Sequence, residues 1–307
     1  MGPLFLGIAG IVILLINSID FILTTLLVGR GGPFTSVISK KLWQFFLFIH
    51  KKTKSHRFLS LVGTLLILVN LSFWIISIWV GWFLIFNISP DSVLRSDTLL
   101  PADSWAKFYF IGFSIITLGV GDYQPGSDLW RVLTILVSLN GLIFLTLAIT
   151  YLLSVVSAVV DKRAVAAYIS SLGYTPEDII TRSFQNGKID NLTPHFNALT
   201  PKLLHLAQEY LAYPILHSFH SPRVETAIVL SVAALDEALT TIEHGISPEL
   251  KIPSTTIFTL RRAITLFIAT QNHKYYIKNI NAPLIPDLQV LKDYGIPVAG
   301  KEKFNKK

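Results

Sequence analysis

The chain has 307 residues, of which 51% are hydrophobic and only 15% are charged, and its mean hydropathy is +0.55. Soluble proteins carry about 25% charged residues, so this composition excludes an ordinary soluble globular protein and indicates a membrane protein. Cysteine is absent, which excludes disulfides, cysteine-ligated zinc and iron–sulfur clusters, and the formal net charge is +7.

Three apolar stretches, residues 3–28, 58–86 and 129–160, are long enough to cross a hydrocarbon core of about 30 Å as helices. The loop between the first two is rich in lysine and arginine, whereas the loop after the second carries mixed charges. The positive-inside rule therefore predicts that the first loop is cytoplasmic and the N-terminus is outside. With three spans, the C-terminus is then cytoplasmic, and we expect a multi-pass protein of the cell membrane.

The basic residues gather in the loop between the first two spans and in the tail that holds Lys301, Lys303, Lys306 and Lys307. Small basic patches beside membrane spans are typical of attraction to the anionic lipid of the inner leaflet. We therefore expect membrane lipid as a partner and no nucleic acid.

Two polar residues, Asn17 and Asp20, lie one helical turn apart in the first span. An ionisable residue in a membrane helix indicates a functional role by default, and the alternative is a hydrogen bond to a neighbouring span. The span has no arginine ladder, so the sequence does not encode a voltage sensor of the familiar type.

A short aromatic segment, residues 103–116, follows the second span and ends directly before residues 117–122, which read Thr-Leu-Gly-Val-Gly-Asp. About 14 residues are too few to cross the bilayer, so we predict a half-crossing helix buried in protein. A helix C-terminus carries partial negative charge. The two glycines permit a backbone whose carbonyls point at one axis, which is the chemistry of a cation selectivity filter.

Together with a span on either side, this arrangement resembles the pore module of the potassium channel family over roughly residues 58–160. The resemblance implies a homotetramer of prokaryotic type, in an inner membrane, that conducts K⁺ passively and needs no cofactor and no catalytic residue. It also implies that the threonine hydroxyl and the carbonyls replace the hydration shell of K⁺, while the aspartate braces the outer mouth. The implied filter residues are Thr117, Leu118, Gly119, Val120, Gly121 and Asp122.

Two positions differ from the usual pattern of the family. Val120 stands where most relatives have tyrosine or phenylalanine, and Phe113 stands where some have a glutamate that braces the filter aspartate. The ring that usually stiffens the filter is therefore missing, which leaves a weakly selective cation channel as an alternative to a K⁺-selective one.

In the third span, Gly141 has a spacing from the filter similar to that of the hinge glycine of bacterial two-span potassium channels, and close helix packing is the alternative role. Asn140 beside it is expected to face the cavity or a helix contact. Apolar side chains at helical spacing follow, which suits a constriction that closes by dewetting. The constriction candidates are Phe144, Leu145, Ala148 and Leu152.

From residue 161 the composition becomes that of a soluble helical domain, without clear alternating strand patterns. Ser/Thr-Pro pairs mark helix starts, because a hydroxyl N-cap before a first-turn proline is a typical beginning. We predict helices near 163–172, 176–185, 201–219, 222–244 and 255–275. No G-x-G-x-x-G follows a strand pattern, so a dinucleotide-binding domain is not supported.

Histidine and carboxylate occur at metal-ligand spacing in this region, since His205 and Glu209 lie one helical turn apart and His217 and His220 follow Pro214. These residues are weak candidates for a zinc or other divalent site, for a pH sensor, or for ordinary solvated or core histidines. The sequence shows no pairing of a nucleophile with a general base that would indicate an enzyme.

The sequence therefore predicts an all-α membrane protein with three transmembrane helices, a re-entrant pore helix and an all-α cytoplasmic domain. The expected domains are the N-terminal helix with its basic linker (1–57), the two-span pore domain (58–160) and the helical cytoplasmic domain (161–307). The predicted function is a tetrameric K⁺ channel gated by the cytoplasmic domain. The alternative from another class is a membrane-anchored sensor or scaffold with a non-conducting pore module.

Overall fold

The structure, a computed structural model, divides into two compact units, Met1–Phe45 with Thr64–Ser154, and Phe46–Gly63 with Val155–Lys307. The basic tail with Lys301, Lys303, Lys306 and Lys307 lies outside the described residues, and the helix expected at 255–275 ends at Thr270. The structure describes residues 2–27, 29, 31–53, 56–185, 189, 191–247, 250, 252–271, 291, 293 and 298.

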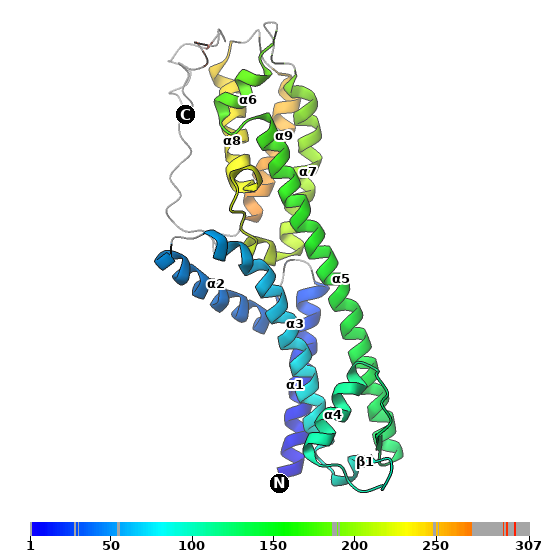
Figure 1. Ribbon diagram of the computed structural model, residues 1–307. Helices are drawn as coiled ribbons and strands as arrows, with labels where there is room; N and C mark the ends of the chain where they lie inside the picture. The colour runs from blue at the N-terminus through cyan, green and yellow to red at the C-terminus, as the bar shows by residue number, and fades with distance from the viewer. Residues whose placement is uncertain are drawn as a thin grey trace. The chain divides into compact units, whose positions relative to one another are not determined.

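The first unit is built on long apolar helices (Figure 1). α1 (Gly2–Thr25), α3 (His56–Phe86) and α5 (Asp128–Leu172) are each long and apolar enough to cross a membrane, which confirms the predicted spans. Only 28%, 39% and 22% of their most apolar windows are buried within the chain, so most of this surface requires lipid or another chain. α2 (Pro33–Thr53) connects α1 to α3 along the sequence.

Between α3 and α5 the first unit holds a short helix, α4 (Ser104–Ile115), and a small antiparallel ribbon. The ribbon pairs β1 (Val93–Arg95) with β2 (Tyr123–Pro125), with Val93 opposite Pro125 and Arg95 opposite Tyr123. A 3₁₀ turn, η1 (Pro90–Ser92), leads into β1. The ribbon therefore ties the loop after α3 to the segment that follows residues 117–122.

Asp20 of α1 is fully buried and organises the start of α2. Its Oδ1 accepts hydrogen bonds from the backbone N–H groups of Phe34 (2.7 Å) and Thr35 (3.2 Å), which are otherwise unpaired at a helix N-terminus. Its Oδ2 accepts from the Thr35 hydroxyl and, at 2.9 Å, from Nε1 of Trp74 in α3. These contacts support the interpretation of Asp20 as a residue that bonds a neighbouring span.

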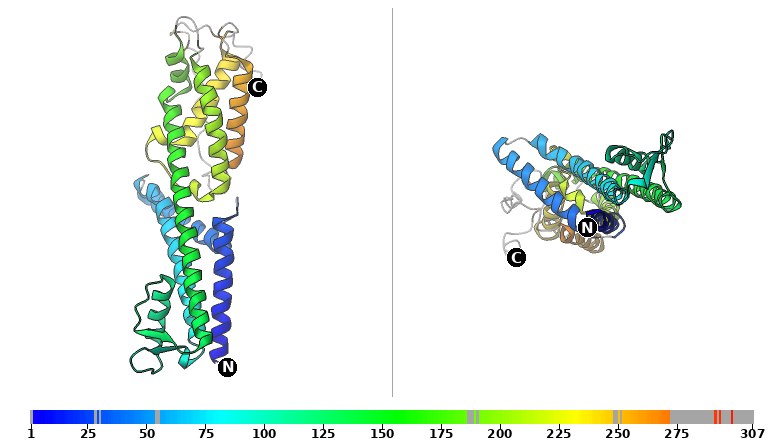
Figure 2. Two further views of the ribbon diagram at one scale, coloured as in Figure 1. Left: turned by 90° about the vertical axis from the view of Figure 1, so that its right-hand side faces the viewer. Right: turned by 90° about the horizontal axis from the view of Figure 1, so that it is seen from below.

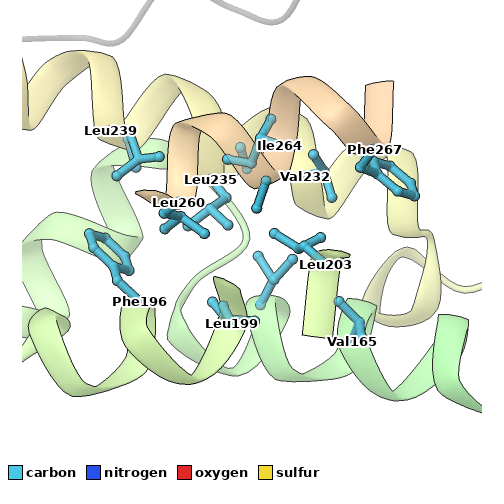
Figure 3. Close-up of a cluster of buried hydrophobic side chains, with 14 of the residues drawn as sticks. Val165, Phe196, Leu199, Leu203, Val232, Leu235, Leu239, Leu260, Ile264 and Phe267 are labelled. Atoms are coloured by element: carbon cyan, nitrogen blue, oxygen red, sulfur yellow. The ribbon is translucent and has the colours of Figure 1, made fainter. Parts of the chain in front are cut away.

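The second unit is a helical bundle formed by the end of α5 and the helices that follow it. α7 and α9 lie side by side in both views (Figure 1 and Figure 2), and their facing side chains form a continuous buried core (Figure 3). Phe196, Leu203, Leu235 and Leu260, which are fully buried, contribute to that core. The elements are α6 (Pro176–Ser183), α7 (Leu192–Ala212), η2 (Pro214–Ser218), η3 (Val224–Thr226), α8 (Ile228–Thr240), a π-helical turn η4 (Thr241–Gly245) and α9 (Ser254–Thr270).

Several of the predicted helix boundaries in this unit are wrong. The helix expected at 201–219 begins at Leu192, because Pro194 rather than Pro201 occupies the first turn, where its missing N–H group costs nothing. Thr200 does not cap a helix; its hydroxyl bonds the Phe196 carbonyl inside α7 at 2.9 Å. The helix ends at Ala212 before Pro214, and the one expected at 222–244 begins only at Ile228.

Candidate ion pathway

α4 is a capped and firmly held helix at the position predicted for the pore helix. The Asp103 carboxylate accepts a hydrogen bond from the N–H of Ala106 at 2.7 Å, which fixes the first turn. Nε1 of Trp79 in α3 donates to the Phe108 carbonyl at 2.8 Å, and the two rings stack 4.5 Å apart. A Cβ on Gly112 would lie 2.4 Å from the Trp79 ring, so this glycine permits the close approach of α4 to α3.

The sign of the backbone angle φ alternates along residues 117–121. Thr117, Gly119 and Gly121 have φ of +54°, +63° and +89°, whereas Leu118 and Val120 do not have positive φ. A φ of alternating sign is a backbone conformation that glycine permits and that lets carbonyls point at one axis, as in a cation selectivity filter. A positive φ on a threonine costs about 1–3 kcal/mol, so the surrounding fold enforces this conformation.

Two backbone hydrogen bonds attach this segment to the end of α4. The N–H of Thr117 donates to the Ser114 carbonyl at 3.1 Å, and the N–H of Leu118 donates to the Phe113 carbonyl at 2.8 Å. The carbonyl oxygens of residues 117–121, in contrast, accept no hydrogen bond from the described part of the chain. They are therefore free to coordinate a cation at the negative end of the α4 dipole.

The two positions that depart from the family pattern lie in different surroundings. Phe113 is buried in an aromatic cluster, with its ring 5.2 Å from that of Tyr109 and 5.1 Å from that of Phe110. Val120 is 48% exposed. The Asp122 carboxylate is hydrogen-bonded to no described residue, although its backbone carbonyl accepts from the N–H of Ser96 at 3.0 Å. Within one chain, Phe113 thus supports α4 by packing and does not brace Asp122.

Gly141 of α5 contacts the end of the pore helix. A Cβ at this position would lie 2.0 Å from the Ile115 carbonyl oxygen, so no other residue fits without movement of α4 or α5. Next to it, the Ser138 hydroxyl donates to the Ser114 carbonyl at 2.9 Å, and Oδ1 of Asn140 accepts from Nε1 of Trp82 at 3.2 Å. Close packing therefore accounts for Gly141, and Asn140 makes a helix contact; the hinge role stays a prediction.

The constriction candidates occupy different faces of α5. Phe144 is 6% exposed, and its ring lies 4.9 Å from that of Phe21 in α1 and 6.4 Å from that of Trp74 in α3. Ala148 is buried in the same cluster. This packing speaks against a pore-lining role for both, because their side chains face helices of their own chain. Leu145 is 52% exposed and Leu152 is partly exposed, and both stay predictions.

A hydroxyl stripe on α5 was missed by the sequence reasoning. Thr146 and Thr150 are exposed and Ser154 is partly exposed, and each hydroxyl bonds the carbonyl four residues earlier, at 2.9, 2.9 and 3.0 Å. Such bonds satisfy the hydroxyls inside a membrane, yet they leave a polar row on an otherwise apolar helix. The spacing of i, i+4 and i+8 was the available signal.

The histidine candidates of the second unit separate into two groups. Nε2 of His205 lies 3.4 Å from Oε1 of Glu209, and Asp161 of α5 joins them, with ligand atoms all within 4.8 Å of one another. His217 instead packs against the Tyr210 ring, at 4.9 Å between centroids, and neither it nor His220 belongs to a cluster of potential metal ligands in the described residues. Asp161 was not predicted, because it is remote from His205 in sequence.

Known proteins resemble this chain over both its pore segment and nearly its whole length. Residues 69–158 match the model of a family described as "Ion channel". A Bacillus subtilis (strain 168) relative, the "Uncharacterized membrane protein YdjJ", is 35% identical over 300 residues, which cover 97% of this chain and 87% of the relative. No solved structure matches. The chain thus belongs to the same family of membrane proteins as this relative, and its residues 69–158 form an ion channel domain with a pore module of the potassium-channel type.

Proposed function

We propose that four copies of this chain form a K⁺ channel whose selectivity filter is made by residues 117–121. The observation that carries the proposal is the row of unpaired carbonyls, with φ of alternating sign, at the C-terminal end of α4. Carbonyl oxygens in this arrangement replace the water that K⁺ loses on entry. Conduction of this kind is passive and requires neither a catalytic residue nor a cofactor other than the conducted ion.

The exposed side chains around the filter support assembly into a tetramer. Ile116, Leu118 and Val120 are 58%, 63% and 48% exposed in a single chain. Non-helical backbone at membrane depth is tolerated only where protein or a water-filled cavity surrounds it. Neighbouring subunits arranged about one axis supply both, since they cover the apolar side chains and enclose the carbonyls.

The charge of the loops supports a cell-membrane channel with its C-terminal unit in the cytoplasm. α5 contains 45 residues, or about 68 Å at 1.5 Å per residue, and therefore exceeds the hydrocarbon core of about 30 Å. The same helix that follows the filter thus enters the second unit. This continuity supports gating by the second unit through α5.

Flux through the purified protein in liposomes tests the filter. We expect K⁺ flux from the wild type and its loss in Gly119→Ala, because alanine disfavours the φ of +63° at this position by about 1–2 kcal/mol in every subunit. Gly2→Ala is the matched control, since Gly2 has open space and no positive φ. Absence of K⁺ flux from the assembled wild type would instead favour the membrane-anchored sensor or scaffold, and undiminished flux in an assembled Gly119→Ala protein would contradict the proposed filter.

A weakly selective cation channel is the second candidate, and Val120 is the observation that favours it. Valine offers neither a hydroxyl nor a ring that could stiffen the backbone of residues 117–121. Reversal potentials under K⁺ and Na⁺ gradients distinguish the two: a clear preference for K⁺ supports the selective channel, and comparable permeabilities support the second candidate. In the second case, Val120→Tyr is expected to raise the preference for K⁺.

A further inference from the structure

Three potential metal ligands of the second unit meet outside the proposed ion pathway. Asp161 belongs to α5, and His205 and Glu209 lie one turn apart on α7. The side chain of His205 is 69% exposed and that of Glu209 is 12% exposed. The group is therefore open to solvent on the histidine side and closed on the glutamate side.

The carboxylate of Glu209 is incompletely satisfied in this position. Oε2 of Glu209 is buried and accepts no hydrogen bond from the described residues. A buried carboxylate beside a second carboxylate is costly unless a proton or a cation neutralises the pair, and the nearby imidazole of His205 makes a cation a suitable partner.

We propose that Asp161, His205 and Glu209 bind one divalent transition-metal ion per chain, with zinc as the best match. One imidazole nitrogen and two carboxylate oxygens are common zinc ligands, and an imidazole favours zinc over magnesium or calcium. Tetrahedral ligands at about 2.0–2.1 Å from zinc stand about 3.3–3.4 Å from each other. The 3.4 Å between Nε2 of His205 and Oε1 of Glu209 matches this spacing.

Such an ion cross-links α5 to α7. The exposed face of His205 leaves the fourth position to water, as in zinc sites with three protein ligands. Because α5 is also the helix that follows the filter, bound metal restrains the helix on which the proposed gating depends. The binding itself is independent of the proposed function and is measured without any ion flux.

The test is zinc binding by the full-length, metal-free protein in detergent, measured by titration calorimetry. We expect one zinc per chain, and a loss of affinity of at least about tenfold in both Glu209→Gln and His205→Ala. His244→Gln is the matched control, because His244 also lies beside a glutamate, with Nε2 3.6 Å from Oε2 of Glu243, but belongs to no three-residue cluster among the described residues. This variant is expected to bind zinc as the wild type does.

The substituted proteins are expected to stay folded, so that a loss of zinc affinity reports the loss of a ligand. Glutamine has nearly the same shape as glutamate, and His205 is mostly exposed, so its removal leaves the core intact. Cobalt provides a second measurement, since tetrahedral Co²⁺ absorbs visible light and the absorption should vanish in His205→Ala. Absence of zinc binding by the wild type, or equal losses in His205→Ala and His244→Gln, would overturn the proposal.

Discussion

Asp20 illustrates how one carboxylate inside a span can serve the fold. Its hydrogen bonds go to the N-terminus of α2 and to Trp74 of α3, so a single side chain joins three helices. The sequence identified Asp20 as unusual but did not distinguish a functional role from a structural one. Its partners Thr35 and Trp74 are distant along the chain, and only the folded structure brings them together.

Replacement of Asp20 by asparagine is expected to destabilise the protein. The amide NH₂ group would face N–H and O–H donors in place of an oxygen, which leaves buried groups unpaired at a cost of about 1.5–3 kcal/mol. Thermal unfolding in detergent measures the change. Asp97→Asn serves as control, because the side chain of Asp97 is 61% exposed and its pair with Arg95 contributes little. Equal melting temperatures for Asp20→Asn and the wild type would contradict the structural role.

His217 should make the second unit sensitive to acid. Burial, assisted by the charge of Lys162, lowers the pKa of His217 from 6.5 to about 4. Because the folded-state pKa lies below the unfolded value, the stabilising contribution is complete above about pH 6.5 and is lost as the pH falls toward 4. At pH 5 the loss is about 2 kcal/mol.

The unfolding of wild-type protein and of His217→Gln at pH 7.5 and pH 5 isolates this contribution. Glutamine does not titrate, so the variant should lose less stability on acidification than the wild type. Titrating groups that do not interact with His217 act equally in both proteins and cancel in the comparison. An identical loss in the two proteins would show that His217 is not the source of the acid sensitivity.

At the scale of elements, α5 shows what helical periodicity can and cannot predict. The helical spacing predicted a pore constriction that includes Phe144 and Ala148, whereas the structure buries these two residues together against their own chain. The spacing did not reveal these contacts, because Phe21 and Trp74 come from α1 and α3. The existence of α4, in contrast, was predictable because its cap, its length and the motif that follows it are all local in sequence.

The hydroxyl stripe of Thr146, Thr150 and Ser154 marks the face of α5 that we expect to line the pore. Exposed hydroxyls in a membrane helix favour a water-filled cavity over lipid. Since the protein has no cysteine, single cysteines can be introduced without a modified background. Thr150→Cys should react with a water-soluble thiol reagent and lose flux. Ala148→Cys, which is buried against the same chain, should react slowly; the reverse order of reactivity would place the pore on the Ala148 face.

On the scale of the whole molecule, a single chain is incomplete as an ion pathway. The carbonyls of the proposed filter accept no hydrogen bond from the described residues, and the three spans bury at most 39% of their most apolar windows. Both deficits disappear if copies surround a common axis in closed rotational symmetry. The number of subunits is therefore a property of the assembly and cannot be derived from α4 or residues 117–122 of one chain.

Mixing active and inactive subunits counts the copies that share one pathway. If wild-type and Gly119→Ala chains are co-expressed in equal amounts and assemble at random, a tetramer contains only wild-type chains in about one sixteenth of the complexes. A dimer would retain about one quarter of the flux, and independent chains about one half. We expect K⁺ flux to fall to about one sixteenth of the wild-type value, because one displaced filter segment disrupts every ion site on the axis. Co-expression with Gly2→Ala, which leaves the filter unchanged, should retain full flux, and a residual flux near one half would mean that each chain conducts alone.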